Sequence, residues 1–236
     1  LPQNEQTKIF LKLLGFKKIK KIGNIKFSEI QKTPTIKFNS GIKKFFNSKK
    51  IWCASSTHKG EEILCGITHQ KMSKIYNNLL TIIIPRHVNR TVEIKRCLEN
   101  NGLKVHIHSN KEKIDKKTDI YLVDTYGETQ SFFNICKTIF LGGSIVKHGG
   151  QNPLEPARFG CKIIHGPNID NFKEVYELLK HKKISFQINS INQLYVEVKK
   201  LLKQKSNNVK KVLNLRRYGV KILNETLLEI NKFIQN

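Results

Sequence analysis

The chain has 236 residues, of which 43 are Lys or Arg and 18 are Asp or Glu, so its formal net charge is +25. Apolar residues make up 39% of it, enough for the core of one good-sized domain or two small ones. No apolar run approaches the roughly 20 residues of a membrane-spanning helix, and no signal-peptide pattern opens the sequence. The five cysteines are scattered without a Cys-x-x-Cys pair, which argues against zinc and disulfides and favours a reducing, cytosolic setting.

The first 48 residues differ in character from the rest. The chain starts Leu-Pro-Gln and its only methionine is Met72, so we expect the sequence to be a piece of something longer. A short helix is predicted over residues 5–15, and a lysine-rich stretch without a clear period follows. We interpret residues 1–48 as the tail of a preceding domain together with a linker.

From residue 51 onward the pattern alternates between strand and helix. In chain order we predict a strand at 51–56, a helix at 59–76, a strand at 79–85, a helix at 88–102, strands at 103–108 and 119–124, a short helix after 127, a strand at 137–143, a helix opening at 152–153, a strand at 161–166, a helix at 171–180, a strand at 184–188 and a helix from 191. Short, continuously apolar strands separated by helices predict a parallel sheet covered on both faces, a Rossmann-like doubly wound α/β fold. This domain is expected to span residues 49–205, with a basic amphipathic helix over residues 206–236.

The segments that follow the strands carry the candidate site, because ligands of such sheets bind beyond the carboxyl ends of the strands. These segments are Thr-His-Lys-Gly-Glu-Glu (57–62), Pro-Arg-His (85–87), Thr-Tyr-Gly-Glu (125–128), and a run from Gly142-Gly143 through Gly149-Gly150 to Asn-Pro-Leu-Glu (152–155). Singly, each is typical of a cap, a turn or a surface residue. Together they predict a pocket with hydroxyls, a guanidinium, glycines and carboxylates at one edge of one sheet.

The chemistry of this pocket suits a nucleotide. Arg86 can give paired hydrogen bonds to a phosphate, and the helix starts near Gly127 and Asn152 offer N–H groups to an anion. Glycines let the backbone approach a ligand, and Glu155 can accept hydrogen bonds from ribose hydroxyls or simply cap its helix. The P-loop lysine motif is absent and Gly-Gly-Ser is a poor dinucleotide fingerprint, which disfavours an ATPase or a dehydrogenase.

Five stretches, "ASSTHKGEE", "PRHVNR", "DTYGE", "FLGGSIVKHGGQNPLEPA" and "GPNIDNF", occur in an order and spacing that resemble the 3-deoxy-D-manno-octulosonic acid (Kdo) transferases. That family has two Rossmann-like domains in the GT-B arrangement, and the resemblance covers nearly the whole chain. It implies that the chain is the carboxyl-terminal, donor-binding half. The residues it implies as contacts of the cytidine monophosphate (CMP) portion of CMP-Kdo are Pro85, Arg86, Tyr126, Gly127, Glu128, Asn152, Pro153, Leu154 and Glu155.

The resemblance also implies a catalytic role outside the sheet. The segment "GNIKF" is similar to the family's Gly-Asn-Leu-Lys-Phe motif, whose lysine stabilises the transition state, and this places that role on Lys26. Without the family, Lys26 is one more surface lysine. The family commonly has Met at the position of Tyr126.

The activity implied is transfer of Kdo from CMP-Kdo to lipid A precursor in lipopolysaccharide synthesis. No metal or cofactor is needed if Arg86 and Lys26 stabilise the departing phosphate. In the family the general base lies in the amino-terminal domain, so we expect this chain to bind donor but transfer little sugar. The expected location is the cytoplasmic face of the bacterial inner membrane, peripheral or anchored through a preceding segment.

The net charge and the fold leave alternatives open. A charge of +25 suits an anionic phospholipid surface as well as nucleic acid, but the lysines are not interleaved with aromatics as base stacking would require. We therefore expect a membrane surface as a partner and no nucleic acid. The remaining alternatives are a GT-B transferase with another donor, such as a UDP-sugar, and a basic nucleic-acid-binding module.

Overall fold

The computed structural model describes residues 1–3, 5–28, 38–110, 112–204 and 209–234. The chain divides into two compact units: Thr33–Asn207, here called the sheet unit, and Leu1–Lys32 together with Asn208–Asn236, here called the helical unit. Part of the predicted linker, residues 29–37, lies outside the described residues. The domain boundaries expected from the sequence, 1–48, 49–205 and 206–236, stay a prediction.

The sheet unit is built on seven parallel strands in the order β3-β4-β2-β1-β5-β6-β7. Their bounds are β1 Lys50–Thr57, β2 Leu79–Pro85, β3 Val105–Ile107, β4 Ile120–Leu122, β5 Thr138–Leu141, β6 Lys162–His165 and β7 Ser185–Gln187. Every residue of β2 is buried, as expected of a central strand covered on both faces. The predicted doubly wound α/β fold is confirmed.

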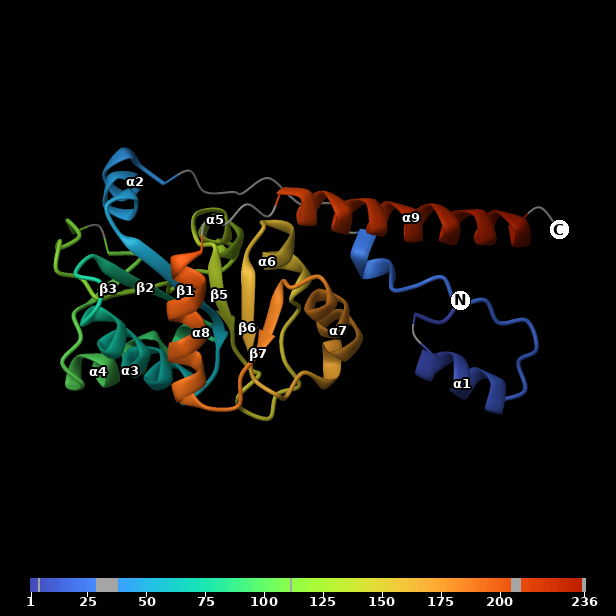
Figure 1. The fold of residues 1–236 in the computed structure, drawn as a ribbon, viewed down its shortest axis with the longest axis horizontal. Coiled ribbons are helices and arrows are strands. Elements are labelled where there is room, and N and C mark those ends of the chain that lie inside the picture. Colours follow the sequence, from blue (N-terminus) through green and yellow to red (C-terminus); the bar gives the residue numbers. More distant parts are fainter. Residues whose placement is uncertain (4, 29–37, 111, 205–208, 235–236) are drawn as a thin grey trace. The chain divides into compact units, whose positions relative to one another are not determined.

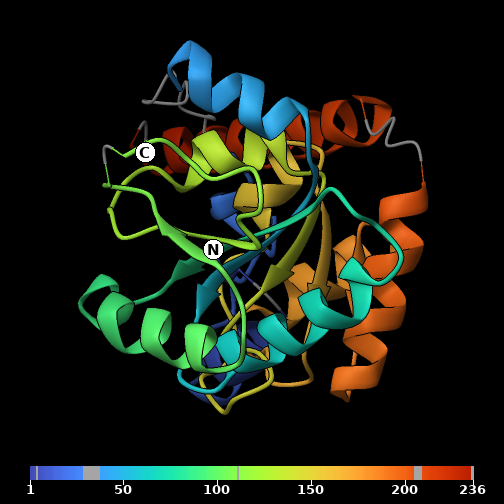
Figure 2. The ribbon, with the colours of Figure 1, turned by 90° about the vertical axis from the view of Figure 1, so that its left-hand side faces the viewer.

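Helices cover the two faces of this sheet. They are α2 Ser40–Asn47, α3 Glu61–Ser73, α4 Thr91–Asn100, α5 Thr129–Ile135, α6 Leu154–Arg158, α7 Lys173–His181 and α8 Ile191–Lys203, with 3-10 turns η2 Val88–Arg90 and η3 Asp170–Phe172. Figures 1 and 2 show α3, α4 and α8 on one side of the sheet and α2, α5 and α6 on the other.

Two apolar cores result, one on each face. Successive residues of β1 point to opposite sides, so Trp52 packs in the core with α3, α4 and α8, and Cys53 packs in the core with α2 and α5. Cys53 and Trp52 are both fully buried. Burial raises the pKa of the Cys53 thiol, which keeps it protonated and apolar in this setting.

Helix α2 is not predicted by the sequence, because its lysines and Gly41 obscure the apolar period. Asn39 begins it, since its side-chain oxygen accepts the backbone N–H of Ile42 at 2.8 Å. Phe46 is buried in the core and packs edge-on against Tyr121 of β4, with 5.1 Å between the ring centroids. Ile42 and Phe45 of the same helix pack against this core as well, so an N-cap and one apolar face dock this short helix on the sheet.

The helical unit contains α1 Glu5–Leu13, the 3-10 turn η1 Ile25–Ser28 and α9 Val209–Ile234. Gly219 of α9 lets η1 approach closely, because a Cβ atom there would lie 2.1 Å from the carbonyl oxygen of Phe27. Phe27 packs edge-on against Tyr218, and Lys20 pairs with Glu229 at 2.6 Å. None of the described helices combines the length and apolar content that crossing a bilayer requires.

Candidate functional site

The topology of the sheet creates a switch point between β1 and β5. The chain leaves β1 toward β2 on one side, and after β4 it returns to the other side of β1 as β5. Such a switch point is where open α/β sheets bind ligands, beyond the carboxyl ends of the strands. The ends of β1, β2 and β5 are in register here, with Thr57 opposite Pro85 and Ser55 opposite Leu141.

A buried carboxylate links the loops on the two sides of this switch point. Glu61 opens α3 and is fully buried. One of its oxygens accepts the N–H groups of His58 at 3.0 Å and Gly143 at 2.8 Å. The other accepts those of Ser144 at 3.2 Å and Ile145 at 3.0 Å. The four bonds satisfy the carboxylate inside the protein and fix the loop after β5 to the start of α3.

Gly142 is required by this arrangement. A Cβ atom there would lie 2.5 Å from the carbonyl oxygen of Ser56 and 2.7 Å from the carboxylate of Glu61. The second pair is also packed internally: Gly150 donates its N–H to the carbonyl of Gly143, and a Cβ on Gly149 would meet the side chain of Asn171. The close approaches that the sequence suggested for a ligand are, in this structure, approaches between parts of the chain itself.

Three histidines lie close together at the same edge of the sheet, one from each of the loops after β1, β2 and β5. The ring of His58 lies 4.2 Å from that of His148 with an angle of 32° between them, and 6.1 Å from that of His87. His58 is buried, whereas the other two are exposed. Burial lowers the pKa of His58, and His148 lowers it further, while Glu61 and the carbonyl of Ser56 oppose the shift. Nothing in the sequence alone singles out these rings.

The end of β1 also holds unusual polar groups. Ser56 has φ of 55°, a left-handed conformation that costs a non-glycine residue energy and that recurs at functional sites. Within the described residues, the buried hydroxyls of Ser55 and Thr57 have no hydrogen-bond partner. Buried polar groups in proteins are nearly always paired, so this strand end is the under-satisfied part of the site.

Pro85 and Arg86 end β2 at this edge. Pro85 is buried, and the backbone N–H of Arg86 donates to the carbonyl of Thr57 at 2.9 Å. That bond continues the pairing of β2 with β1 past the last strand residue. Arg86 is exposed.

The predicted Tyr-Gly-Glu motif lies between β4 and α5. Tyr126 is 69% exposed and Gly127 has φ of +81°, so a turn presents the tyrosine ring to solvent. Glu128 precedes the first residue of α5; its carboxylate accepts the hydroxyl of Thr125 at 2.5 Å and lies 2.7 Å from the Nε2 of His108.

The Asn-Pro-Leu-Glu motif forms the start of α6. The side-chain oxygen of Asn152 accepts the N–H of Leu154 at 3.1 Å, while Pro153 and Leu154 are buried. Glu155 is half-buried, and its carboxylate accepts a hydrogen bond from the Nε2 of Gln130 in α5 at 3.0 Å. The structure thus brings two predicted motifs together through Gln130, which the sequence analysis missed because nothing local marks it.

Lys26 belongs to η1 of the helical unit, where its backbone N–H donates to the side chain of Asn24 at 3.0 Å. Its catalytic role stays a prediction.

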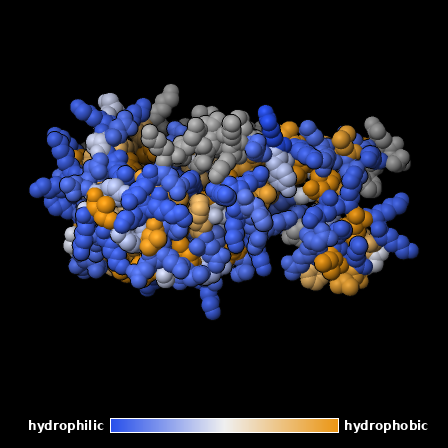
Figure 3. All heavy atoms as spheres, viewed as in Figure 1, coloured by the Kyte–Doolittle hydropathy of each residue, from blue (hydrophilic) through white to orange (hydrophobic). Residues whose placement is uncertain are grey.

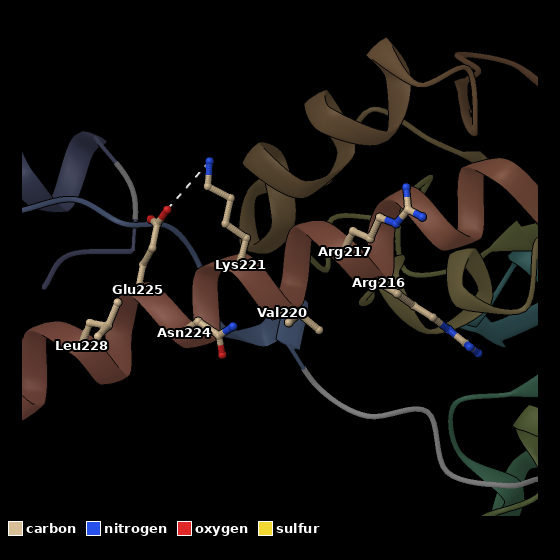
Figure 4. Close-up of a pocket in the computed structure, with 7 residues that line it drawn as sticks. All are labelled: Arg216, Arg217, Val220, Lys221, Asn224, Glu225 and Leu228. Atoms are coloured by element: carbon tan, nitrogen blue, oxygen red, sulfur yellow. Dashed lines mark ion pairs between the residues drawn. The ribbon is translucent and has the colours of Figure 1, made fainter.

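Two further features of the described residues bear on the choice of site. No group of three His, Cys, Asp or Glu side chains among them is placed to hold a metal ion. Figure 4 shows a depression lined by one helix, α9, with a single ion pair between Lys221 and Glu225 at 3.8 Å. A row of exposed side chains on one helix lacks the converging polar groups of a catalytic site. The carboxyl edge of the sheet is therefore the candidate site.

Comparison with known proteins gives a consistent result, although no family model matches the chain. A Kdo transferase of Haemophilus influenzae is 31% identical over 180 residues, 75% of this chain and 42% of that protein. One from Rickettsia bellii is 30% identical over 229 residues, 94% of this chain and 52% of that protein. The chain spans about half the length of the curated relatives it matches.

Among solved structures, the C-terminal CMP-Kdo binding domain of WaaA from Acinetobacter baumannii aligns with a TM-score of 0.64 and 23% identity. The alignment covers 78% of this chain and 98% of that domain, so the two share a fold.

The parallel sheet and its switch point define the Rossmann-like, carboxyl-terminal domain of the GT-B fold. The curated relatives then fix the family. This chain belongs to the Kdo transferases, and the resemblance drawn from its motifs is confirmed.

Proposed function

We propose that this chain binds the CMP portion of CMP-Kdo and is the donor-binding half of an enzyme that transfers Kdo to lipid A precursor. The observation that carries the proposal is the convergence of motifs from β2, β4 and β5 at one switch-point edge, with the Gln130–Glu155 bond linking the second motif to the third. The names of the relatives support the same donor.

The chemistry follows from the charges that must be stabilised. Transfer breaks the bond between the anomeric carbon and the phosphate, leaving an oxocarbenium-like sugar and a departing CMP phosphate. The exposed guanidinium of Arg86 suits that phosphate, and Lys26 would add a second cation in the assembled enzyme. Glu155, already an acceptor for Gln130, has oxygen lone pairs left for ribose hydroxyls.

The acceptor hydroxyl needs a general base. We assign that base to the part of the relatives that this chain does not span, which makes the isolated chain a binder of donor with little or no transfer. Substantial transfer by the purified chain alone would refute this assignment.

Association with a membrane surface is part of the proposal. Apolar side chains of the helical unit that are more than half exposed include Ile9, Phe10, Leu13, Leu14 and Phe16. Orange atoms gather over α1 in Figure 3; in the sequence Lys12 lies between these apolar residues, and Lys8, Lys17 and Lys18 flank them. Apolar anchors beside cations are typical of a surface that attracts anionic lipids, so we place the enzyme at the cytoplasmic face of the bacterial inner membrane.

The binding claim is tested with two variants and two ligands. Arg86→Ala and Glu155→Ala should each weaken CMP binding about tenfold or more, since each removes a charge-assisted hydrogen bond. Glu177→Ala, which removes an exposed carboxylate of α7, is the control and should bind CMP as the wild type does. Tight, salt-sensitive DNA binding that survives both site variants, without CMP binding, would instead support a nucleic-acid module.

A further inference from the structure

We propose that His58 and His148 form a subsite for the carboxylate of the donor's sugar acid, and that the pair takes up one proton when the carboxylate binds. The inference rests on the proposed function and deepens it, because it names the group that would distinguish an acidic sugar from a neutral one.

The two histidines lie on opposite sides of the switch point of the sheet. His58 follows β1 and His148 lies in the loop after β5, so the two rings face each other across the switch point where a ligand of this fold binds. Their centroids are 4.2 Å apart. His58 is 7% exposed and His148 is exposed, which gives the pair one buried member and one that solvent or a ligand can reach.

The backbone N–H groups of the loop after β5 are engaged within the protein. Loop N–H groups are the usual anion ligands at such an edge, but those of Gly143, Ser144 and Ile145 are already bonded to Glu61. These three N–H groups are therefore not available to an anion. The imidazoles of His58, His87 and His148 come from the loops after β1, β2 and β5 and lie within 6.1 Å of one another through His58, so they can bind an anion at this edge.

The hydrogen bond of His58 determines which of its ring nitrogens can take up a proton. The Nδ1 of His58 lies 3.1 Å from the carbonyl oxygen of Ser56 and must carry hydrogen to bond to it, so the neutral ring has its lone pair on Nε2. A neutral His58 is then an acceptor at Nε2 and repels a carboxylate. Protonation from solvent converts Nε2 into a cationic donor, and no other atom changes its bonding.

The surroundings explain why the proton would arrive with the ligand. The titratable groups around His58 are Glu61 at the start of α3, His87 after β2 and His148 after β5. Burial and the two neighbouring rings disfavour the imidazolium, and the charge of Glu61 is shared among four N–H groups. A bound carboxylate supplies a counter-charge directly, which favours the protonated pair.

The test separates the acid group from the rest of the donor. Free Kdo and its methyl ester, which lacks the charge, are titrated by calorimetry into the intact chain saturated with CMP, in two buffers of different ionisation enthalpy. We expect Kdo to bind with uptake of close to one proton, and the ester to bind at least about tenfold more weakly with none. Above the pKa of His58, which burial lowers, Kdo affinity should fall roughly tenfold per pH unit.

Variants identify the residues responsible. His148→Gln changes an exposed ring and should fold normally; it should weaken Kdo binding about tenfold, leave CMP affinity unchanged and retain proton uptake at His58. His58→Gln removes the ring that takes up the proton, so it should weaken Kdo binding and abolish proton uptake, whereas His181→Gln, an exposed ring at the end of α7, should behave as wild type. Equal binding of Kdo and its ester, or unchanged proton uptake in His58→Gln, would overturn the inference while leaving CMP binding intact. Loss of CMP binding in the wild-type chain would instead overturn the proposed function and the inference with it.

Discussion

Glu61 and Gly143 meet across the switch point of the sheet, where the N–H of Gly143 donates to the Glu61 carboxylate at 2.8 Å. The carboxylate also accepts the N–H groups of Ser144 and Ile145, so one buried side chain determines the path of the loop that leads to the Asn-Pro-Leu-Glu motif. The geometry of the proposed donor site therefore depends on a residue that need not touch the ligand.

Replacing Glu61 tests this dependence. In Glu61→Gln one carboxylate oxygen becomes an amide that cannot accept an N–H, leaving buried donors unpaired. We expect a loss of about 2–4 kcal/mol in unfolding free energy and at least a tenfold loss of CMP affinity in the protein that remains folded. Denaturant unfolding and calorimetry well below the melting temperature measure the two.

Glu62→Gln is the matched control for that variant. Glu62 is equally close to the site in sequence and also buried, but its carboxylate pairs with Arg90 at 3.0 Å and not with the loop. It should lose stability with little change in CMP affinity. Equal loss of CMP affinity in the two variants would mean that Glu61 acts only through general stability.

Gly142 offers a steric test of the same junction. Gly142→Ala would push a methyl group to 2.5 Å from a backbone oxygen, which cannot rotate away. We expect destabilisation of about 2–4 kcal/mol, measured by denaturant unfolding. In Gly41→Ala of α2 the nearest atom would lie at 3.5 Å, so that variant should be neutral or stabilised by up to about 1 kcal/mol. A tolerated alanine at 142 would contradict the close approach described here.

Gln130 and Glu155 should act together in nucleotide binding. The bond between them orients the Glu155 carboxylate, so Gln130→Ala should lower CMP affinity even though Gln130 need not contact the nucleotide. In a double-mutant cycle, the pair should show a coupling energy of about 0.5–2 kcal/mol. Additive effects of the two substitutions on CMP affinity would show that the bond has no role in binding.

Acid should destabilise the sheet unit through His165. This ring is 3% exposed, and burial lowers its pKa from 6.5 to about 4. Below pH 6.5 the unfolded chain therefore binds a proton at His165 that the folded chain does not bind. As the pH drops toward 4, this residue lowers the free energy of unfolding by about 3 kcal/mol. Unfolding measured between pH 7 and 4 should show a shallower decline in His165→Gln than in the exposed-ring control His181→Gln. Parallel declines would exclude His165 as the cause.

The sequence predicts the framework of this protein well, because the buried parallel strands are continuous apolar runs bounded by polar turns. It also predicts that the residues after the strands gather at one edge, since that follows from the topology alone. It does not predict the partners of those residues. Glu61 has the appearance of an ordinary acidic residue in a first helical turn, and its bonds to Gly143 and beyond connect positions more than 80 residues apart.

The same limit applies to the glycines and the histidines. Gly142-Gly143 signals a close backbone approach, but only the structure identifies the approaching group as the chain's own carboxylate. His58 and His148 are 90 positions apart and share no motif, so the contact between their rings cannot be predicted from the sequence. Long-range pairing, rather than local propensity, determines both features.

The central claim is that the carboxyl edge binds a cytidine nucleotide, and calorimetric titration of the chain with CMP, with UMP and AMP as controls, tests it most directly. We expect saturable one-to-one binding of CMP, at least about tenfold tighter than the binding of UMP or AMP. Equal affinity for all three nucleotides, or tighter binding of UMP, would contradict it.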